Sequence, residues 1–277
     1  MKLIQWFPGH MTKAMRMMEE NVKLVDCVVS VLDARAAFAC VNPRLEKLFQ
    51  DKPVVYVLGK SDLVEKSDAA RLCAAFSSQG KDAVCVSAFD KRSVGRLYEH
   101  IVEALAEKQA RYKEKGIVKP LRVMVAGIPN TGKSTLINAF AGAKKAVTGD
   151  KAGVTKGKQW IRLEGLELLD TPGTMPPSFE NQTYAKHLAY IGSINDDILD
   201  FEELTLELLA ELAKIAPQAL KEKYAIENFD APPLELYEQV CRRRGFLLRG
   251  GEFDYERCAK AVIDDFRKGK LGKIALE

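Results

Sequence analysis

The segment that most restricts how this chain can fold is residues 127–134, Gly-Ile-Pro-Asn-Thr-Gly-Lys-Ser. It fits the pattern G-x-x-x-x-G-K-[ST], and it lies between an apolar run at 121–126 and a helix-like apolar stretch at 135–140. Glycines at both ends let the backbone curl, so that its N–H groups converge on an anion at the positive end of the following helix. The pattern therefore predicts a phosphate-binding loop (P-loop) between a strand and a helix.

The side chains of this loop have distinct expected roles. Lys133 is expected to reach the β- and γ-phosphates of a nucleotide, and the Ser134 hydroxyl to bind Mg²⁺, which prefers oxygen ligands. The rest of the predicted cradle comes from the loop and the first helical turn, at Asn130, Thr131, Gly132 and Thr135.

A second motif, Asp-Thr-Pro-Gly at 170–173, follows a strand expected at 167–169. In P-loop enzymes an Asp at a strand end holds Mg²⁺, usually through water. We therefore expect Asp170 at the metal and the amide of Gly173 near the γ-phosphate. Thr155, in a basic segment between the two motifs, is the predicted second hydroxyl for Mg²⁺; the alternative is an ordinary surface threonine.

A third motif, Gly-Lys-Ser-Asp at 59–62, follows the apolar run 54–58 and is similar to the N-K-x-D motif that binds guanine. The Asp62 carboxylate can accept from both N1–H and the exocyclic amine of guanine, and adenine has no matching donor pair. The Lys60 stem is expected to lie across the base, and Ser61 belongs to the same loop. Gly59 stands where Asn is usual, which removes a side chain that braces the loop.

A fourth element supports the guanine prediction. Ser87 and Ala88, after the apolar run 83–86, resemble the S-A-K element that contacts guanine through its backbone, with Phe89 in place of the Lys. The predicted guanine residues thus precede the predicted phosphate residues along the chain. This is the reverse of the usual order, and it indicates a circularly permuted arrangement, since a site depends on spatial position and not on chain order.

The pattern of apolar residues predicts an α/β fold. Short runs at 25–32, 54–58, 83–86 and 121–126 are typical of buried parallel strands, and helical stretches at 67–78 and 94–107 lie between them. Residues 161–163 and 167–169 flank Gly165 and predict a hairpin joined to the sheet. Residues 111–120 are polar and are expected to form a surface connector that joins the original termini.

The last part of the chain has a different pattern. From about residue 200, apolar residues recur at helical spacing, as at Leu204, Leu208 and Leu212. We therefore expect a P-loop α/β domain over residues 1–180 and a small all-helical domain over residues 181–277. Met11, Met15 and Met18 form a similar stripe, which favours packing on the sheet over a partner-binding face.

The net charge, the apolar runs and the cysteines indicate where this protein works and say less about its function. The net charge of +4 is too small to indicate a nucleic-acid binder by itself. No apolar run approaches the about 18 residues of a membrane span, and the start of the chain lacks a signal peptide, so we expect a cytoplasmic protein without membrane association. We also expect a monomer. The six cysteines show no C-x-x-C pair and are expected to be buried free thiols, Cys27 and Cys85 in particular.

Taken together, these motifs closely resemble the YlqF-type family of circularly permuted GTPases. The resemblance covers essentially the whole chain and includes Trp-Phe-Pro-Gly-His-Met at 6–11, Asp-Ala-Arg at 33–35 and Arg-Gly-Phe at 244–246. It implies a GTPase that assists late assembly of the large ribosomal subunit, binds its rRNA and is stimulated by the ribosomal particle.

The resemblance also implies roles for individual residues. In place of the glutamine that orients water in Ras-type enzymes this chain has Thr174, and the family assigns that role to a histidine in the N-terminal motif, hence His10. Its Pro-Gly-His setting predicts a loop ahead of a helix, where a cap or surface residue is the alternative. An Asn at the position of Asn130 can ligate K⁺ beside the phosphates in GTPases with this P-loop pattern.

Two groups of basic residues are candidates for RNA contact. Guanidinium groups suit phosphate recognition, and a solvated basic helix end is the alternative. The candidates are Lys156 and Lys158 in the basic segment and Arg242, Arg243, Arg244 and Arg249 in the helical domain.

Two other functions stay open at this stage. One is a nucleotide-dependent RNA-binding or scaffold module with negligible turnover, and the other is an ATP-using P-loop enzyme, which the Lys60–Asp62 pattern disfavours.

Overall fold

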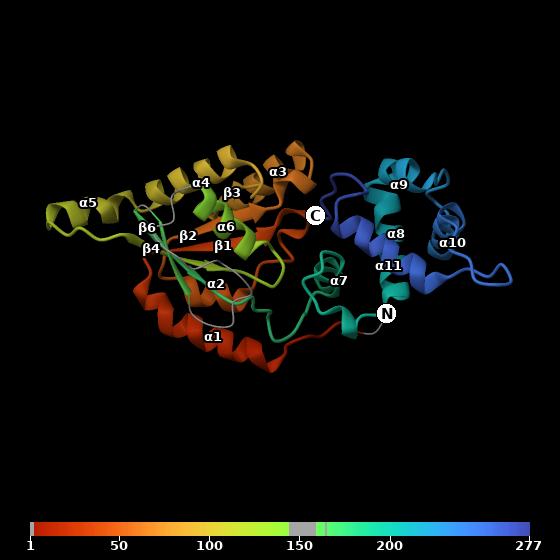
Figure 1. Ribbon diagram of the computed structural model, residues 1–277, viewed down its shortest axis with the longest axis horizontal. Coiled ribbons are helices and arrows are strands. Elements are labelled where there is room, and N and C mark those ends of the chain that lie inside the picture. Colours follow the sequence, from red (N-terminus) through yellow and green to blue (C-terminus); the bar gives the residue numbers. More distant parts are fainter. Residues whose placement is uncertain (1–2, 144–158, 164) are drawn as a thin grey trace. The chain divides into compact units, whose positions relative to one another are not determined.

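The computed structural model describes residues 3–143, 159–163 and 165–277, and the chain divides into two compact units (Figure 1). The α/β unit comprises Trp6–Ser178 and the last residue, Glu277. The helical unit comprises Phe179–Leu276 and the N-terminal residues up to Gln5. Along the chain, the main boundary therefore falls between residues 178 and 179.

The α/β unit is built on one six-stranded sheet in the order β3-β2-β1-β4-β6-β5. All neighbouring strands are parallel except β5, which forms a hairpin with β6 through Gly165, whose φ is +79°. The strands are β1 Cys27–Asp33, β2 Val54–Gly59, β3 Asp82–Cys85, β4 Leu121–Ala126, β5 Gln159–Leu163 and β6 Leu166–Asp170. The predicted parallel strands and hairpin are confirmed.

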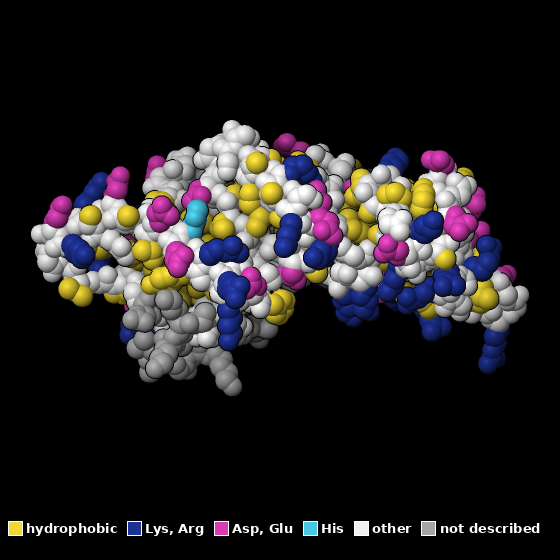
Figure 2. Space-filling view, turned by 90° about the horizontal axis from the view of Figure 1, so that it is seen from above, with side chains coloured by type: hydrophobic (Ala, Val, Ile, Leu, Met, Phe, Trp, Pro, Cys, Tyr) yellow, Lys and Arg dark blue, Asp and Glu magenta, His cyan; other side chains and the backbone are white. Residues whose placement is uncertain are grey.

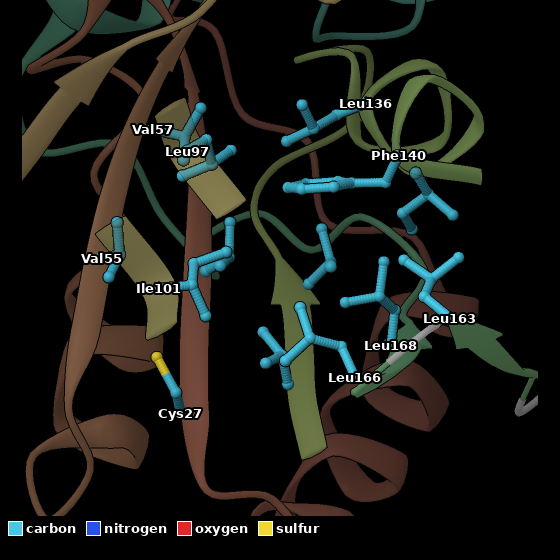
Figure 3. Packing of buried hydrophobic residues seen from close by; sticks show 14 of the residues in the cluster. Cys27, Val55, Val57, Leu97, Ile101, Leu136, Phe140, Leu163, Leu166 and Leu168 are labelled. Carbon is cyan, nitrogen blue, oxygen red and sulfur yellow. The ribbon is translucent and has the colours of Figure 1, made fainter. Parts of the chain in front are cut away.

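Helices cover both faces of this sheet, because its strands carry apolar side chains in both directions. One face packs against α4 (Lys91–Ala104) and α6 (Lys133–Ala143), where Leu97, Ile101 and Phe140 meet strand residues such as Val57 and Leu168 (Figure 3). The opposite face packs against α1 (Gly9–Asn21) and α2 (Pro43–Phe49). Met15 and Met18 are at most 1% exposed there, so the predicted packing of the methionine stripe on the sheet is confirmed.

The predicted helix at 94–107 and the predicted connector at 111–120 are wrong in detail. The helix expected at 94–107 ends at Ala104, and α5 (Ala106–Glu114) follows after Leu105. The first residues of the expected connector, 111–114, therefore belong to a helix, because Arg, Lys and Glu have high helix propensity even where they are exposed. The remaining elements of this unit are α3 Lys66–Ser77 and the 3₁₀ turns η1 Val22–Leu24, η2 Ala34–Ala36 and η3 Ser61–Leu63.

The helical unit contains α7 Gln182–Tyr190, η4 Asp196–Ile198, α8 Phe201–Ile215, α9 Pro217–Tyr224, α10 Pro233–Arg244 and α11 Tyr255–Arg267. Its core includes Leu204, Leu208 and Leu212 of α8, as their spacing predicts. Arg267 ties the unit together: its guanidinium donates to both carboxylate oxygens of Asp196 and to the carbonyls of Ala189 and Tyr190. Within the described ranges of both units, no helix has the length and apolar character needed to cross a membrane.

The cysteines are all free thiols, but they are not equally buried. Cys27, Cys40, Cys241 and Cys258 are buried, whereas Cys73 and Cys85 are partly exposed. The prediction of a buried Cys85 is wrong because β3 is an edge strand of the sheet, with a neighbour on one side only.

Candidate nucleotide-binding site

The P-loop runs from the end of β4 to the start of α6, where the sequence predicts it. The loop curls because its backbone has positive φ angles at Asn130 (+61°) and Gly132 (+96°). At Gly127 (φ +149°) a Cβ atom would lie 2.4 Å from the carbonyl oxygen of Val31, so no other residue fits against β1. The Thr131 hydroxyl donates to the Ile128 carbonyl over 3.2 Å and closes the loop from inside.

The P-loop lysine is held inside this loop. Lys133 is 7% exposed, and its Nζ donates to the Ile128 carbonyl over 2.7 Å. Burial lowers the pKa of Lys133 to about 8, although the Asp170 carboxylate acts in the opposite direction. A phosphate group would replace the carbonyl as the partner of this ammonium and would favour its charged form.

Oxygen donors that suit Mg²⁺ lie around this lysine. Asp170 ends β6, is fully buried and pairs in register with Val125 of β4, one residue before that strand ends. Ser134 lies in the first turn of α6. A buried carboxylate beside the P-loop lysine, with a hydroxyl one residue on, is a donor set of the kind that Mg²⁺ prefers, so Asp170 and Ser134 fit the predicted roles. Thr155 lies outside the described residues.

The segment after Asp170 lies directly against the P-loop. The Thr174 N–H donates to the Gly127 carbonyl over 3.2 Å. At Gly173 a Cβ atom would lie 2.6 Å and 2.7 Å from the backbone N and Cα of Pro129. Only glycine allows this approach, which brings the Gly173 backbone to the loop where the phosphates are expected.

The guanine-binding loop begins at the end of β2. Its Lys60 is in left-handed backbone (φ +54°), and its Nζ contacts Asp33 Oδ2 at 2.8 Å and donates to the Asn130 carbonyl at 2.7 Å. The Lys60 ammonium thus joins the base loop to the P-loop, and the placement of its stem across the base stays a prediction. A Cβ atom on Gly59 would lie 3.2 Å from the Leu32 carbonyl oxygen, so the strands leave little room for a side chain there.

The remaining residues that are predicted to bind guanine lie in the loops that follow β2 and β3, at the same edge of the sheet. Asp62 lies in η3 and is exposed. The Ser61 N–H donates to the Val86 carbonyl over 3.3 Å, which connects this loop to the one carrying Ser87 and Ala88. The Ser87 N–H donates to Ser93 Oγ of α4, so that helix braces the second loop, while Phe89 is 83% exposed.

Asp33 and Arg35 form the part of the site that motif reasoning did not assign. Arg35 Nε and Nη2 donate to the two carboxylate oxygens of Asp33 at 2.9 Å and 2.8 Å. Burial raises the pKa of Asp33, but the charges of Arg35 and Lys60 outweigh it and hold that pKa below its ordinary value. Asp33 is therefore a buried anion that anchors Lys60. The sequence feature that could have indicated this role is the charged pattern Asp-Ala-Arg at 33–35, directly after the apolar run 25–32.

The candidate His10 lies apart from these hydrogen bonds. It is exposed in the first turn of α1, so the prediction of a loop ahead of the helix is wrong at this residue. The next residue, Met11, is buried, and its Sδ accepts from the Met175 N–H over 3.3 Å. The helix turn that carries His10 thus packs on the segment that follows Gly173.

The candidate RNA residues that the structure describes lie in the helical unit. Arg242, Arg243 and Arg244 form the last turn of α10, and they are exposed, as is Arg249. Arg244 also contacts Asp265 at 3.3 Å and lies over the Phe246 ring. Lys156 and Lys158 lie outside the described residues.

The sheet explains how a reversed motif order still makes one site. All of these loops follow the carboxyl ends of neighbouring parallel strands, which meet at one edge of an open sheet. Guanine recognition comes early in this chain and phosphate binding late, and this order on such an edge defines a circularly permuted P-loop GTPase.

Comparisons with known proteins identify the family. A family model described as "50S ribosome-binding GTPase" matches residues 122–228. The chain is 38% identical to ribosome biogenesis GTPase A of Priestia megaterium, over 99% of this chain and 96% of the relative, and 37% identical to that of Bacillus cereus, over 99% and 94%. The fold is similar to GNP-bound YlqF from T. maritima, with a TM-score of 0.65 and 27% identity over 96% of this chain and 97% of the other.

The chain therefore belongs to the ribosome biogenesis GTPase A family. It is a GTPase, which binds GTP and GDP, uses Mg²⁺ and hydrolyses GTP to GDP and phosphate.

Proposed function

We propose that this GTPase is an assembly factor for the large ribosomal subunit, and that the bound nucleotide controls its association with rRNA in the precursor particle. The names of its relatives, ribosome biogenesis GTPase A, and the family description "50S ribosome-binding GTPase" support a ribosomal partner. That description names the 50S subunit for members of the family; the proposal applies it to this chain and adds the contact with rRNA and the nucleotide control.

One observation supports the proposal that the bound nucleotide controls the association. The Gly173 backbone packs on Pro129 of the P-loop so closely that a γ-phosphate arriving there must act on both segments. In GTPases the γ-phosphate orders such segments, and its loss releases them. The chain continues from this segment to Phe179, where the helical unit begins, with no further nucleotide-binding motif between them.

The proposed RNA surface comprises Arg242, Arg243 and Arg249 in the helical unit, with Lys156 and Lys158 as further candidates. Lys and Arg side chains gather along one edge of that unit (Figure 2). Arg242 also lies 5.3 Å over the Phe253 ring, which holds its guanidinium in place for phosphate contact. Arg244 has a structural partner in Asp265 and contributes less to this surface.

The test compares the affinity of the protein for large-subunit precursor particles in two states, with GDP and with a non-hydrolysable GTP analogue. We expect the GTP state to bind more tightly by about 5–150-fold, or about 1–3 kcal/mol, and the particle to raise GTP affinity by the same factor. The salt concentration must be fixed, because phosphate contacts are salt-sensitive. Equal affinities in the two states would refute the nucleotide control.

A matched pair of variants locates the surface. Arg242→Ala with Arg243→Ala should weaken particle binding in both states and reduce its salt dependence. Lys214→Ala with Lys221→Ala, which also removes two exposed cations of the same unit, is the control and should leave binding unchanged. Equal losses in both variants would indicate general charge attraction and would remove α10 from the proposed surface.

We further propose that particles stimulate hydrolysis and that His10 positions the attacking water. The hydrogen bond from the Met175 N–H to Met11 supports this, since it connects the helix turn that carries His10 to the segment after Gly173. His10→Ala should lower particle-stimulated single-turnover hydrolysis by about 100-fold, while GTP affinity stays near that of the parent. Normal turnover, or affinity lost in parallel with turnover, would eliminate this assignment.

Asn130 is the proposed K⁺ ligand. Its exposed side chain stands on left-handed backbone at the mouth of the P-loop, where a cation would add positive charge beside the phosphates. Hydrolysis should be faster in K⁺ than in Na⁺ at equal ionic strength, and Asn130→Ala should abolish the difference. Equal rates in the two salts with particles present would contradict this role.

Cytoplasm is the proposed location, and the proposed working form is a monomer. The ribosome-related names of its relatives support the location. Sedimentation equilibrium of the full chain tests the oligomeric state.

A further inference from the structure

Two cysteine side chains of the α/β unit are in direct contact. Cys73 lies in α3, Cys85 is the last residue of β3, and their Sγ atoms are 2.8 Å apart. A disulfide bond is about 2.05 Å long, so less than about 1 Å of movement would bring the two sulfur atoms to bonding distance. Both residues are partly exposed, whereas the other four cysteines of the chain are buried. An oxidant in solution therefore reaches this pair first.

The two thiols are not equivalent. A hydrogen bond from Cys85 stabilises the thiolate of Cys73 and lowers the pKa of Cys73, while the same contact raises the pKa of Cys85. The thiolate is the reactive form of cysteine. Cys73 is thus suited to react first, and Cys85 to resolve the product.

The position of the pair links it to guanine binding. The residue after Cys85, Val86, donates its N–H to Leu58 of β2 and accepts from the Ser61 N–H of the guanine loop. Ser87 follows directly. On the other side, α3 begins at Lys66, three residues after η3, which contains Asp62. A bond between Cys73 and Cys85 would join the helix behind one guanine loop to the strand that leads into the other.

We propose that Cys73 and Cys85 form a reversible regulatory disulfide that raises the affinity of the protein for guanine nucleotides. The oxidant is a peroxide: the Cys73 thiol reacts with H₂O₂ to give a sulfenic acid and water, and the Cys85 sulfur then displaces a second water to form the S–S bond. A dithiol restores both thiols and is itself oxidised to a disulfide. The bond holds the two guanine loops in their binding arrangement, so they lose less conformational freedom when the base binds.

The expected effect follows from linkage. Oxidation should lower the Kd for GDP about fivefold, at the lower end of coupling between two sites. Because coupling is reciprocal, saturating GDP should make the disulfide about fivefold harder to reduce, which corresponds to a reduction potential about 21 mV lower.

The experiment uses the full chain after treatment with H₂O₂ or with dithiothreitol. Peptide mass spectrometry identifies the cross-link, and equilibrium titration with a fluorescent GDP gives the affinity of each form. The comparison of oxidised with reduced parent protein needs no substitution, so it holds even if a variant folds poorly. Cys73→Ser with Cys85→Ser should bind GDP equally well before and after peroxide, whereas Cys241→Ser, at a buried thiol of the helical unit, should respond as the parent does.

Two results would overturn the proposal. One is the absence of a Cys73–Cys85 cross-link under peroxide that oxidises the protein. The other is a cross-linked protein that binds GDP with the same affinity as the reduced protein and whose disulfide is reduced equally easily with and without GDP.

Discussion

Gly173→Ala is expected to slow single-turnover GTP hydrolysis by about 100-fold, the effect that a displacement of about 1 Å has on a positioned reaction centre. The reason is steric: the new Cβ would lie 2.6 Å from Pro129 N and 3.0 Å from the Ile128 carbonyl carbon. Both are backbone atoms, which cannot turn aside as a flexible side chain can. Either the P-loop or the segment after Asp170 must therefore move from its place at the phosphates.

The control for this variant is Gly95→Ala in α4. Nothing lies within 4 Å of a Cβ there, so alanine should leave hydrolysis unchanged and stabilise the helix by up to about 1 kcal/mol. Thermal unfolding of both variants separates loss of activity from loss of fold. If Gly173→Ala hydrolyses GTP at the parental rate, the segment after Asp170 leaves the P-loop before the chemical step.

Arg35→Ala should lower the free energy of unfolding by about 3 kcal/mol, measured by urea denaturation. Removing one partner of a buried ion pair costs about 3–5 kcal/mol, and the lower end applies because Lys60 still faces the Asp33 carboxylate. Asp33 is fully buried, so its charge has no access to water once the guanidinium is gone. The pKa of Asp33 lies below its ordinary 3.8, so the stability from this pair is complete at neutral pH and is lost as the pH falls from 3.8 through the folded value.

A double variant separates the structural from the functional role of this pair. Asp33→Leu with Arg35→Met removes both charges and should recover most of the lost stability. It should not recover nucleotide affinity, because Lys60 then has no carboxylate to hold it between the two loops. Lys260→Ala, which breaks the exposed pair with Glu256, is the control and should cost less than about 1 kcal/mol. If the double variant binds GDP with the parental affinity, Asp33 contributes to the stability of the fold and not to nucleotide binding.

Features encoded locally could be predicted from the sequence. The strand before the P-loop, the turn at Gly165 and the stripe of Met15 and Met18 each depend on neighbouring residues, and the structure has all of them. The same local reasoning predicts the P-loop with Lys133 directly after one strand and Asp170 at the end of another. Parallel strands then bring those ends together, without further information about which strand lies beside which.

Contacts between distant segments could not be predicted. The sequence does not state that Asp33 pairs in register with Gly59, and this register is what brings the Asp33 carboxylate to Lys60. The apolar neighbours of Cys85 predict that it is buried, but an edge position depends on the strand order of the whole sheet. The helix turn that carries His10 packs on the segment after Gly173 through Met11, whose partner Met175 lies 164 positions further along the chain, and local patterns do not specify such a contact.

The strand order also has a consequence during synthesis of the chain. β1 lies between β2 and β4 in the sheet, yet β4 is made only after β3. At about 5–20 residues per second, synthesis of the intervening residues 86–120 takes about 2–7 s. For that time the nascent chain carries an apolar strand, Cys27–Asp33, with one edge unpaired and open to other chains. Slower translation of residues 86–120 would lengthen this interval and increase aggregation before the nucleotide site exists.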